Sequence, residues 1–467
     1  MIPFFPKQIS YRAIIVYLIS LALVSVFYFQ YAMSFGYMVL GVVCVVGFFL
    51  LTNSWTQGWA RFSEKQFIKN VFILALSIRL VWVVASYFYY TDAMGTPFGF
   101  EIFDAVGYHE TALWLAESPW STAFEYFFNT PGVAYSDAGY PLYLTVLYKA
   151  FGPVVIIPRL LKALISAYMC VLIYRIGSRT FGEETGRMAM IMCALMPNFI
   201  FYCGYHLKEP EMIFLEVAFL ERLDYMIRSH KFSFWTLFLL SLITVSLFLF
   251  RTVLGAAALF AAVSAVLFSS APAMKKGYRR FAYVVWGLLG IIVFSGGSIA
   301  AEIEYYWEER GENASNRRYE QTLRGNQWAQ YATGAVMAPM IFVLPFSTMV
   351  DVGQTGQLEK HGGNFIRNFM GFFTLIAIFE AFRRKKWRDF TLIGAFVVAY
   401  LGIIALSGFS NSERFLLPGM PGLILMWAYG VSALTGKTYK LLTPWCIIVV
   451  LMEFAWAFFK LGSRGLF

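Results

Sequence analysis

Charged residues are scarce in this chain, and their scarcity excludes a water-soluble globular protein. Only 14% of the 467 residues are Asp, Glu, Lys or Arg, whereas 59% are hydrophobic. A soluble domain carries roughly 25% charged residues. Instead, apolar runs of 17–20 residues follow one another, each long enough to cross a hydrocarbon core of about 30 Å. Because no water satisfies backbone groups there, the sequence predicts an all-α polytopic membrane protein with a helical bundle fold.

Residues that bind metals or carry redox chemistry are also few. The four histidines and the scattered carboxylates show no metal-ligand spacing, so the sequence predicts no metal site and no cofactor. The net charge of +10 arises from Lys and Arg clustered between the apolar runs, which is typical of loops that face anionic membrane lipids rather than nucleic acid. The five cysteines lie within or at the ends of apolar runs and are interpreted as packing residues: Cys44, Cys170, Cys193, Cys203 and Cys446.

Lys and Arg are absent from one long segment, and this absence sets the predicted orientation. Residues 91–148 contain seven carboxylates and no Lys or Arg. By the positive-inside rule, this segment is expected outside and the basic clusters in the cytoplasm. The clusters are Lys7/Arg12, Arg61/Lys65/Lys69, Arg175/Arg179/Arg187, Arg222/Arg228/Lys231, Lys275/Lys276/Arg279/Arg280, Arg383 to Arg388, and Lys437/Lys440.

Thirteen spanning helices that start inside satisfy every basic cluster. They are predicted at 13–30, 36–52, 71–90, 158–176, 187–205, 210–227, 233–250, 254–271, 281–299, 364–382, 389–407, 416–434 and 442–460. The first apolar run is longer than a signal-peptide core and no small-residue cleavage site follows it, so it is predicted to be a retained helix. Two shorter apolar segments, 139–152 and 332–347, are predicted as re-entrant or surface-lying outer helices.

This topology divides the chain into three parts. Residues 1–70 form an N-terminal two-helix extension with its cytoplasmic loop. Residues 71–271 form a transmembrane module with the outer loop 91–157, and residues 272–467 form a second module with the outer loop 300–363.

Polar residues that a bundle does not need for packing fall on the predicted outer face. Charges at membrane depth cost roughly 2.5–3.5 kcal/mol each, so they tend to be paired or functional. Carboxylates that accept a proton stand there beside cations that hold a phosphate, and we expect them to ring one cavity mouth. Helix capping and snorkelling to the headgroups are the alternative roles for the Lys and Arg residues. The candidates are Asp104, Tyr108, His109, Glu110, Arg159, His206, Lys208, Glu209, Arg251, Glu413 and Arg414.

The order of several motifs resembles the GT-C superfamily, especially protein O-mannosyltransferases and the aminoarabinose transferases that modify lipid A. The resemblance covers about residues 70–270 and departs from the family where Ala105 follows Asp104, because protein mannosyltransferases carry adjacent acidic residues there. Glu101 and Glu110 both remain candidates for the second carboxylate. The motifs are Asp104-Ala-Val-Gly-Tyr108-His109-Glu110, Tyr140-Pro-Leu, Pro158-Arg159-Leu, Leu207-Lys208-Glu209-Pro210 and, late in the chain, Glu413-Arg414-Phe-Leu-Leu-Pro418.

The resemblance implies sugar transfer from a polyprenyl-phosphate donor to a glycan, lipid or protein acceptor, with inversion, on the non-cytoplasmic face of a bacterial inner membrane. Asp104 is then the expected general base and Glu209 the second carboxylate. Arg251, Arg414 and Lys208 are the expected cations for the lipid phosphate. The remaining candidates above are expected to bind substrate.

Two other functions stay open. A lipid-linked oligosaccharide polymerase or ligase would also use outer Arg and His residues, and loop 300–363 supplies Arg310, Arg317, Arg318, Arg324 and His361. A lipid or polysaccharide transporter should show repeated halves and charges near the middle of its helices. The sequence has no internal repeat and its charges gather on the predicted outer face, which makes transport the third choice.

Overall fold

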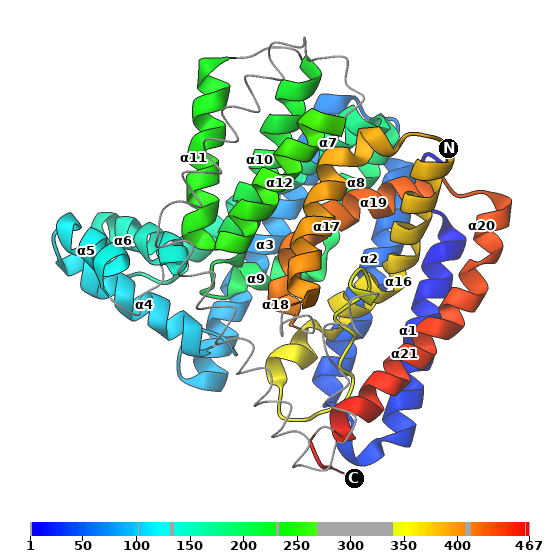
Figure 1. The fold of residues 1–467 in the computed structure, drawn as a ribbon. Coiled ribbons are helices and arrows are strands. Elements are labelled where there is room, and N and C mark those ends of the chain that lie inside the picture. Colours follow the sequence, from blue (N-terminus) through cyan, green and yellow to red (C-terminus); the bar gives the residue numbers. More distant parts are fainter. Residues whose placement is uncertain are drawn as a thin grey trace.

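The protein is described by a computed structural model that covers residues 2–100, 102–130, 135–229, 233–268, 340–406, 412–462 and 464–466. It is built from α-helices, as predicted, and no strand occurs in these ranges (Figure 1). One isolated antiparallel bridge joins Ala32 to Val350. The helices stack into a bundle, and one group of shorter helices projects from its side.

Eight helical segments of the described chain are long and apolar enough to cross a membrane, which fits an integral multi-pass membrane protein. A ninth is reached if α8 (Glu183–Leu195) and α9 (Pro197–Gly204), whose axes differ by 42°, form one broken span. The eight comprise α1 (Lys7–Phe27), α2 (Phe35–Gly58), α3 (Glu64–Met94), α7 (Ile156–Phe181), α16 (Thr355–Arg383), the α17 region (Trp387–Ala405), the α18–α19 region (Glu413–Ser432) and the α20–α21 region (Gly436–Gly462).

The described residues do not confirm the predicted count of thirteen. α10 (Glu209–Ser229), predicted to span at 210–227, is helical, but buried acidic residues such as Glu216 and Glu221 exclude it from the apolar set. α11 (Phe234–Phe250) and α12 (Thr252–Phe268) are apolar but have 17 residues each, the lower limit for a span of about 17–25 residues. The predicted span 281–299 lies outside the described residues.

The first long loop folds into three helices that form the projecting arm in Figure 1. These are α4 (Ile102–Glu117), α5 (Trp120–Asn129) and α6 (Gly139–Phe151), and α6 packs along α4. The helix predicted at 139–152 is therefore confirmed as a short helix. Its 13 residues leave it outside the spanning set.

The prediction of a helix at 332–347 is wrong over residues 340–347, which form turns and irregular chain and no α-helix. The free carbonyls of this stretch are satisfied by two buried side chains of α16. Arg367 donates to the Ile341 carbonyl at 3.2 Å, and Asn368 donates to the carbonyls of Val343 at 2.6 Å and Pro345 at 2.9 Å. Buried backbone groups need such partners when no helix supplies them.

A buried arginine fixes the break between α8 and α9. Pro197 has no backbone N–H, so the Cys193 carbonyl loses its helical partner. Arg79 of α3 is fully buried and donates to the carbonyls of Cys193 at 3.3 Å and Ala194 at 3.1 Å, and to the Ser166 hydroxyl at 2.8 Å. This guanidinium caps the C-terminus of α8, where cations are favourable, and so sets the direction of α9.

We expect Arg79→Leu to lower the free energy of unfolding by about 3 kcal/mol or more, because several buried acceptors lose a charged donor. The measurement is the Tm of the purified protein in detergent. The matched control is Arg12→Leu, which removes one exposed hydrogen bond to Thr443 and should leave the Tm close to wild type. An equal, small shift in both variants would contradict the capping role.

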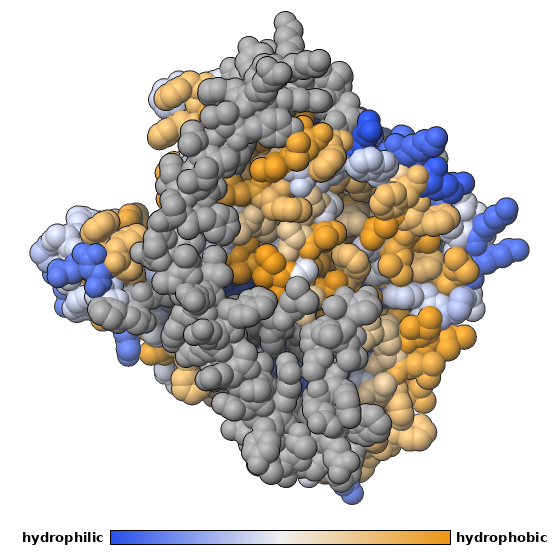
Figure 2. Space-filling view, viewed as in Figure 1, coloured by the Kyte–Doolittle hydropathy of each residue, from blue (hydrophilic) through white to orange (hydrophobic). Residues whose placement is uncertain are grey.

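Basic loops meet at one end of the bundle. Arg179 of α7 pairs with Glu221 and Asp224 of α10 at 2.9 and 2.8 Å. Arg187 of α8 donates to the Phe62 carbonyl at 2.9 Å, in the connection between α2 and α3. Figure 2 shows hydrophobic side chains over most of the coloured bundle surface, with hydrophilic ones gathered near the N-terminus and α20. The predicted site residues lie at the opposite ends of these helices. The basic loop residues and the predicted site residues are therefore separated by the length of the bundle.

Candidate functional site

Arg414 joins two carboxylates that the sequence places far apart. It lies in α18 (Glu413–Leu416) and forms ion pairs with Asp104 of α4 and Glu209 at the start of α10. The Glu209 side chain is fully buried and that of Arg414 is 12% exposed, whereas the Asp104 side chain is 54% exposed. The carboxylate of Asp104 is therefore held by a buried cation yet stays open to solvent or substrate.

Lys208 forms a second ion pair in which a buried cation holds an exposed carboxylate. It is buried and donates to Asp137 in η2 (Tyr135–Asp137) and to the Phe250 carbonyl at 2.9 Å. The Asp137 side chain is 51% exposed. Burial alone would raise the pKa of Asp137, but the charge and hydrogen bond of Lys208 outweigh it and hold that pKa below its ordinary value. The sequence did not single out Asp137.

Arg251 is the third cation at this end, in the turn between α11 and α12. Its guanidinium lies 4.5 Å from the centre of the Phe415 ring and donates to the Tyr400 hydroxyl at 3.4 Å. Within the described residues it forms no ion pair with a carboxylate. We call Asp104, Asp137, Lys208, Glu209, Arg251 and Arg414 the charge cluster.

Tyr108 lies next to the charge cluster. The Lys208 amine lies 5.9 Å from the centre of its ring. Burial and the charge of Asp137 raise the pKa of Tyr108 well above its ordinary value, so it remains a neutral phenol. The Tyr108 ring also packs against Tyr140 of α6 with centroids 5.2 Å apart. A neutral aromatic ring beside exposed carboxylates suits contact with a sugar face.

His109 and His206 meet beside the cluster through one tyrosine. The Tyr148 hydroxyl lies 2.8 Å from His109 Nδ1 and 3.2 Å from His206 Nε2. Burial is the main cause that lowers the pKa of both imidazoles, and the charges of Lys162 and Arg159 lower that of His206 further. Both rings are therefore neutral near pH 7 and act as hydrogen-bonding groups.

Because the pKa values of both histidines are lowered, we expect the protein to lose stability in acid. Their folded pKa values lie below the ordinary 6.5, so their contribution is full above about pH 6.5 and is lost as pH falls below it. We expect the Tm of wild type to fall between pH 7 and pH 5, and His206→Gln to flatten part of this slope. An unchanged slope in His206→Gln would contradict the neutral, buried imidazole.

Arg159 and Glu110, which were also predicted to bind substrate, form no ion pair with the charge cluster. Arg159 is buried at the start of α7 and donates to the Pro97 carbonyl, and its Nε and Nη1 find no hydrogen-bond partner in the described chain. Glu110 is exposed on α4 and makes no hydrogen bond or ion pair with described residues. Glu101, the other candidate for a second carboxylate, lies outside the described residues. Among the described carboxylates, Asp137 and Asp104 both lie near Tyr108.

The sequence placed Glu413 at the same cavity mouth as its neighbour Arg414, and the structure corrects this. Glu413 turns into the bundle, where Asn198 and Tyr202 of α9 donate to it at 2.6 and 2.9 Å. The amine of Lys360 in α16 lies 3.3 Å from Glu413 Oε2, the oxygen to which Tyr202 donates. The Glu413 side chain is only 8% exposed, so it anchors α18 to α9 and α16 and supports Arg414 from behind.

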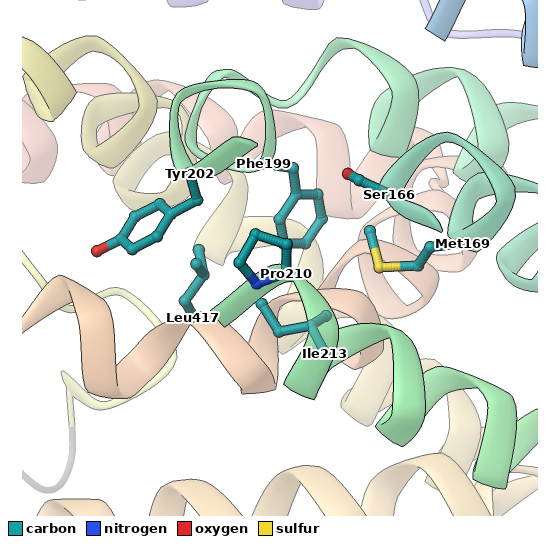
Figure 3. A pocket seen from close by; sticks show the side chains of 7 residues that line it. All are labelled: Ser166, Met169, Phe199, Tyr202, Pro210, Ile213 and Leu417. Carbon is teal, nitrogen blue, oxygen red and sulfur yellow. The ribbon is translucent and has the colours of Figure 1, made fainter. Parts of the chain in front are cut away.

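The bundle beneath the charge cluster is almost filled. A cavity of about 10 Å³ lies there, large enough for about one water. Figure 3 shows its lining, to which α9 contributes Phe199 and Tyr202 and α10 contributes Pro210, next to Glu209. The carboxylates of Asp104 and Asp137, in contrast, are about half exposed. No group of three His, Cys, Asp or Glu among the described residues is placed to hold a metal ion.

Comparison with known proteins does not identify the chain. No protein-family model matches it, and no curated protein matches it. The function is therefore argued from the charge cluster.

Proposed function

We propose that this protein is a membrane glycosyltransferase that moves a sugar from a polyprenyl-phosphate donor to a glycan, lipid or protein acceptor, with inversion, on the non-cytoplasmic face of a bacterial inner membrane. The observation that carries the proposal is the construction of the charge cluster. Half-exposed carboxylates, Asp104 and Asp137, are each paired with a largely buried cation, and Arg251 lies near Glu209 without forming an ion pair with a described carboxylate. Such a site offers a base and a phosphate-binding cation together.

Asp104 takes the part of the general base. Arg414 orients the Asp104 carboxylate, while Glu209 holds Arg414 from the buried side. In the transfer step, the acceptor oxygen or nitrogen forms a bond to the anomeric carbon and gives its proton to Asp104. The bond from that carbon to the phosphate oxygen breaks on the opposite face of the sugar, and prenyl phosphate leaves.

Arg251 takes the part of the phosphate-binding cation. A guanidinium binds phosphate oxygens in a bidentate manner and stabilises the charge that develops on the leaving group. The Phe415 ring and the Tyr400 hydroxyl contact the guanidinium and help to position it. Arg159, with two N–H-bearing nitrogens that have no described partner, is a second candidate for the same anion.

The polymerase or ligase alternative draws on loop 300–363. Of its five candidate residues, only His361 lies within the described chain. It is fully buried in α16, and its Nε2 lies 2.8 Å from the Tyr17 hydroxyl. That residue is therefore a packing histidine within the bundle.

The test offers the purified protein in lipid two donor classes, radiolabelled polyprenyl-phosphate monosaccharides and polyprenyl-diphosphate oligosaccharides, each with a mixed set of acceptors. We expect label transfer and prenyl-phosphate release from a monosaccharide donor alone. Consumption of only the oligosaccharide donors would replace the proposal by the polymerase or ligase function. Translocation of a donor without its consumption would favour a transporter.

A further inference from the structure

A second cavity lies away from the charge cluster, between α2 and α3. Its volume is about 500 Å³, within the range of roughly 300–1,000 Å³ typical of small-molecule sites. α2 contributes Tyr37 and Leu40, α3 contributes Trp82 and Tyr89, and Glu359 of α16 belongs to the lining. α2 and Glu359 lie outside residues 70–270, so the resemblance described above covers only the α3 wall of this cavity.

Glu359 is the one charged residue in the lining of this cavity. The residue is 3% exposed overall, and each of its oxygens accepts a hydrogen bond from a tyrosine hydroxyl, from Tyr90 at 2.6 Å and from Tyr205. The two tyrosine hydroxyls favour the ionised form of this carboxylate, which burial alone would disfavour. Two charge-assisted hydrogen bonds hold the group in place.

Glu359 forms no direct ion pair within the described chain, although the charge of the neighbouring Lys360 acts on it. No Lys or Arg there forms an ion pair with it, and the neighbouring Lys360 lies 3.3 Å from Glu413 instead. A buried charge is costly unless it is paired. A cation in the cavity would give Glu359 the direct ion pair that the described chain does not supply.

The walls around Glu359 are aromatic and suit the same ligand. Tyr37, Trp82 and Tyr89 line the cavity, and the Trp82 indole is fixed by a hydrogen bond to the Phe201 carbonyl at 3.2 Å. Aromatic faces attract ammonium groups, most strongly where water is excluded. Exposed apolar side chains of the same two helices, such as Val39 and Phe88, stand on the surface that faces lipid.

We propose that this cavity binds the ammonium group of an amphipathic amine, with Glu359 as the counter-ion and the apolar part of the ligand along α2 and α3. The amine has two possible sources, the headgroup of an aminophospholipid or a free alkylamine-like molecule. The proposal stands on the cavity and its charge and does not rest on the glycosyltransferase function.

The test measures equilibrium binding of tritiated n-decylamine and n-decanol to the purified full chain in detergent at pH 7, where an alkylamine with a pKa of about 10.4 is protonated. We expect saturable decylamine binding that weakens by about tenfold or more in Glu359→Gln. Decanol should bind more weakly than decylamine, and equally to both proteins. Equal binding of the two probes, or undiminished decylamine binding in Glu359→Gln, would overturn the proposal.

Two further variants guard against misfolding. Gly36→Leu places a side chain at the cavity wall, where a Cβ meets nothing within 4 Å, so it should block decylamine without disturbing the fold. Glu453→Gln changes another buried membrane carboxylate, 1% exposed on α21, and should bind decylamine like wild type. Loss of binding in Glu453→Gln, or full binding in Gly36→Leu, would contradict the site.

Native mass spectrometry separates the two sources. Phosphatidylethanolamine that stays bound to wild type but not to Glu359→Gln, with phosphatidylglycerol of the same chains unaffected, supports a lipid headgroup. Decylamine binding without retained phosphatidylethanolamine supports a free amine. Retention of phosphatidylethanolamine that is equal in Glu359→Gln would contradict a headgroup at this carboxylate.

Discussion

Asp104→Asn should lower the rate constant of sugar transfer by about 10²–10⁴-fold, the usual contribution of a positioned general base. The amide keeps the size of the side chain but cannot accept the proton of the acceptor. Donor binding should stay near wild type, because the cations of the charge cluster remain. The measurement is the single-turnover rate, together with the donor Kd from equilibrium binding.

The matched control for this variant is Glu117→Gln, an exposed carboxylate on the same helix. We expect it to transfer sugar at the wild-type rate. Full activity in Asp104→Asn would remove Asp104 as the base and direct the search to Asp137, the other half-exposed carboxylate of the cluster. Loss of donor binding in Asp104→Asn would instead assign Asp104 a role in holding the site together.

Arg251→Gln should lower kcat/KM for the donor by about 10²–10³-fold, as expected when one stabilising donor to a developing anion is lost. Part of the effect should appear in the donor Kd, because the proposed contact between the guanidinium and the phosphate exists both before and during transfer. Arg251→Lys should recover part of the loss, since it keeps the charge but not the bidentate geometry.

The measurement is steady-state kinetics with varied donor, and Arg12→Gln at the opposite end of the bundle serves as the control. A variant Arg251→Gln with unchanged KM and kcat would show that the phosphate binds elsewhere. Arg159→Gln would then be the next variant, because its guanidinium has donors with no described partner.

The helices were predictable because each apolar run carries its own signal. All twelve predicted spans in the described chain are helical there, although α10 carries too many acidic residues and α11 and α12 are short. The bend at Pro197 also has a local cause. Its geometry, however, depends on Arg79, which lies more than a hundred residues earlier in the chain.

The composition of the site was only partly predictable. The sequence indicated Asp104, Lys208, Glu209, Arg251 and Arg414 because each is a charge next to an apolar run, and the structure brings these together. It missed Asp137, one of seven carboxylates in a loop, because only the packing of that loop against Lys208 distinguishes it. It placed Glu413 at the mouth because sequence adjacency to Arg414 does not show that the two side chains diverge.

The most direct test of the proposed function is the release of prenyl phosphate by the purified wild-type protein in liposomes, counted against labelled sugar on the acceptor. The proposed function predicts one prenyl phosphate released for each sugar transferred, with inverted configuration at the anomeric carbon. Absence of release from every polyprenyl-phosphate monosaccharide, with a protein that is folded and binds those donors, would contradict it.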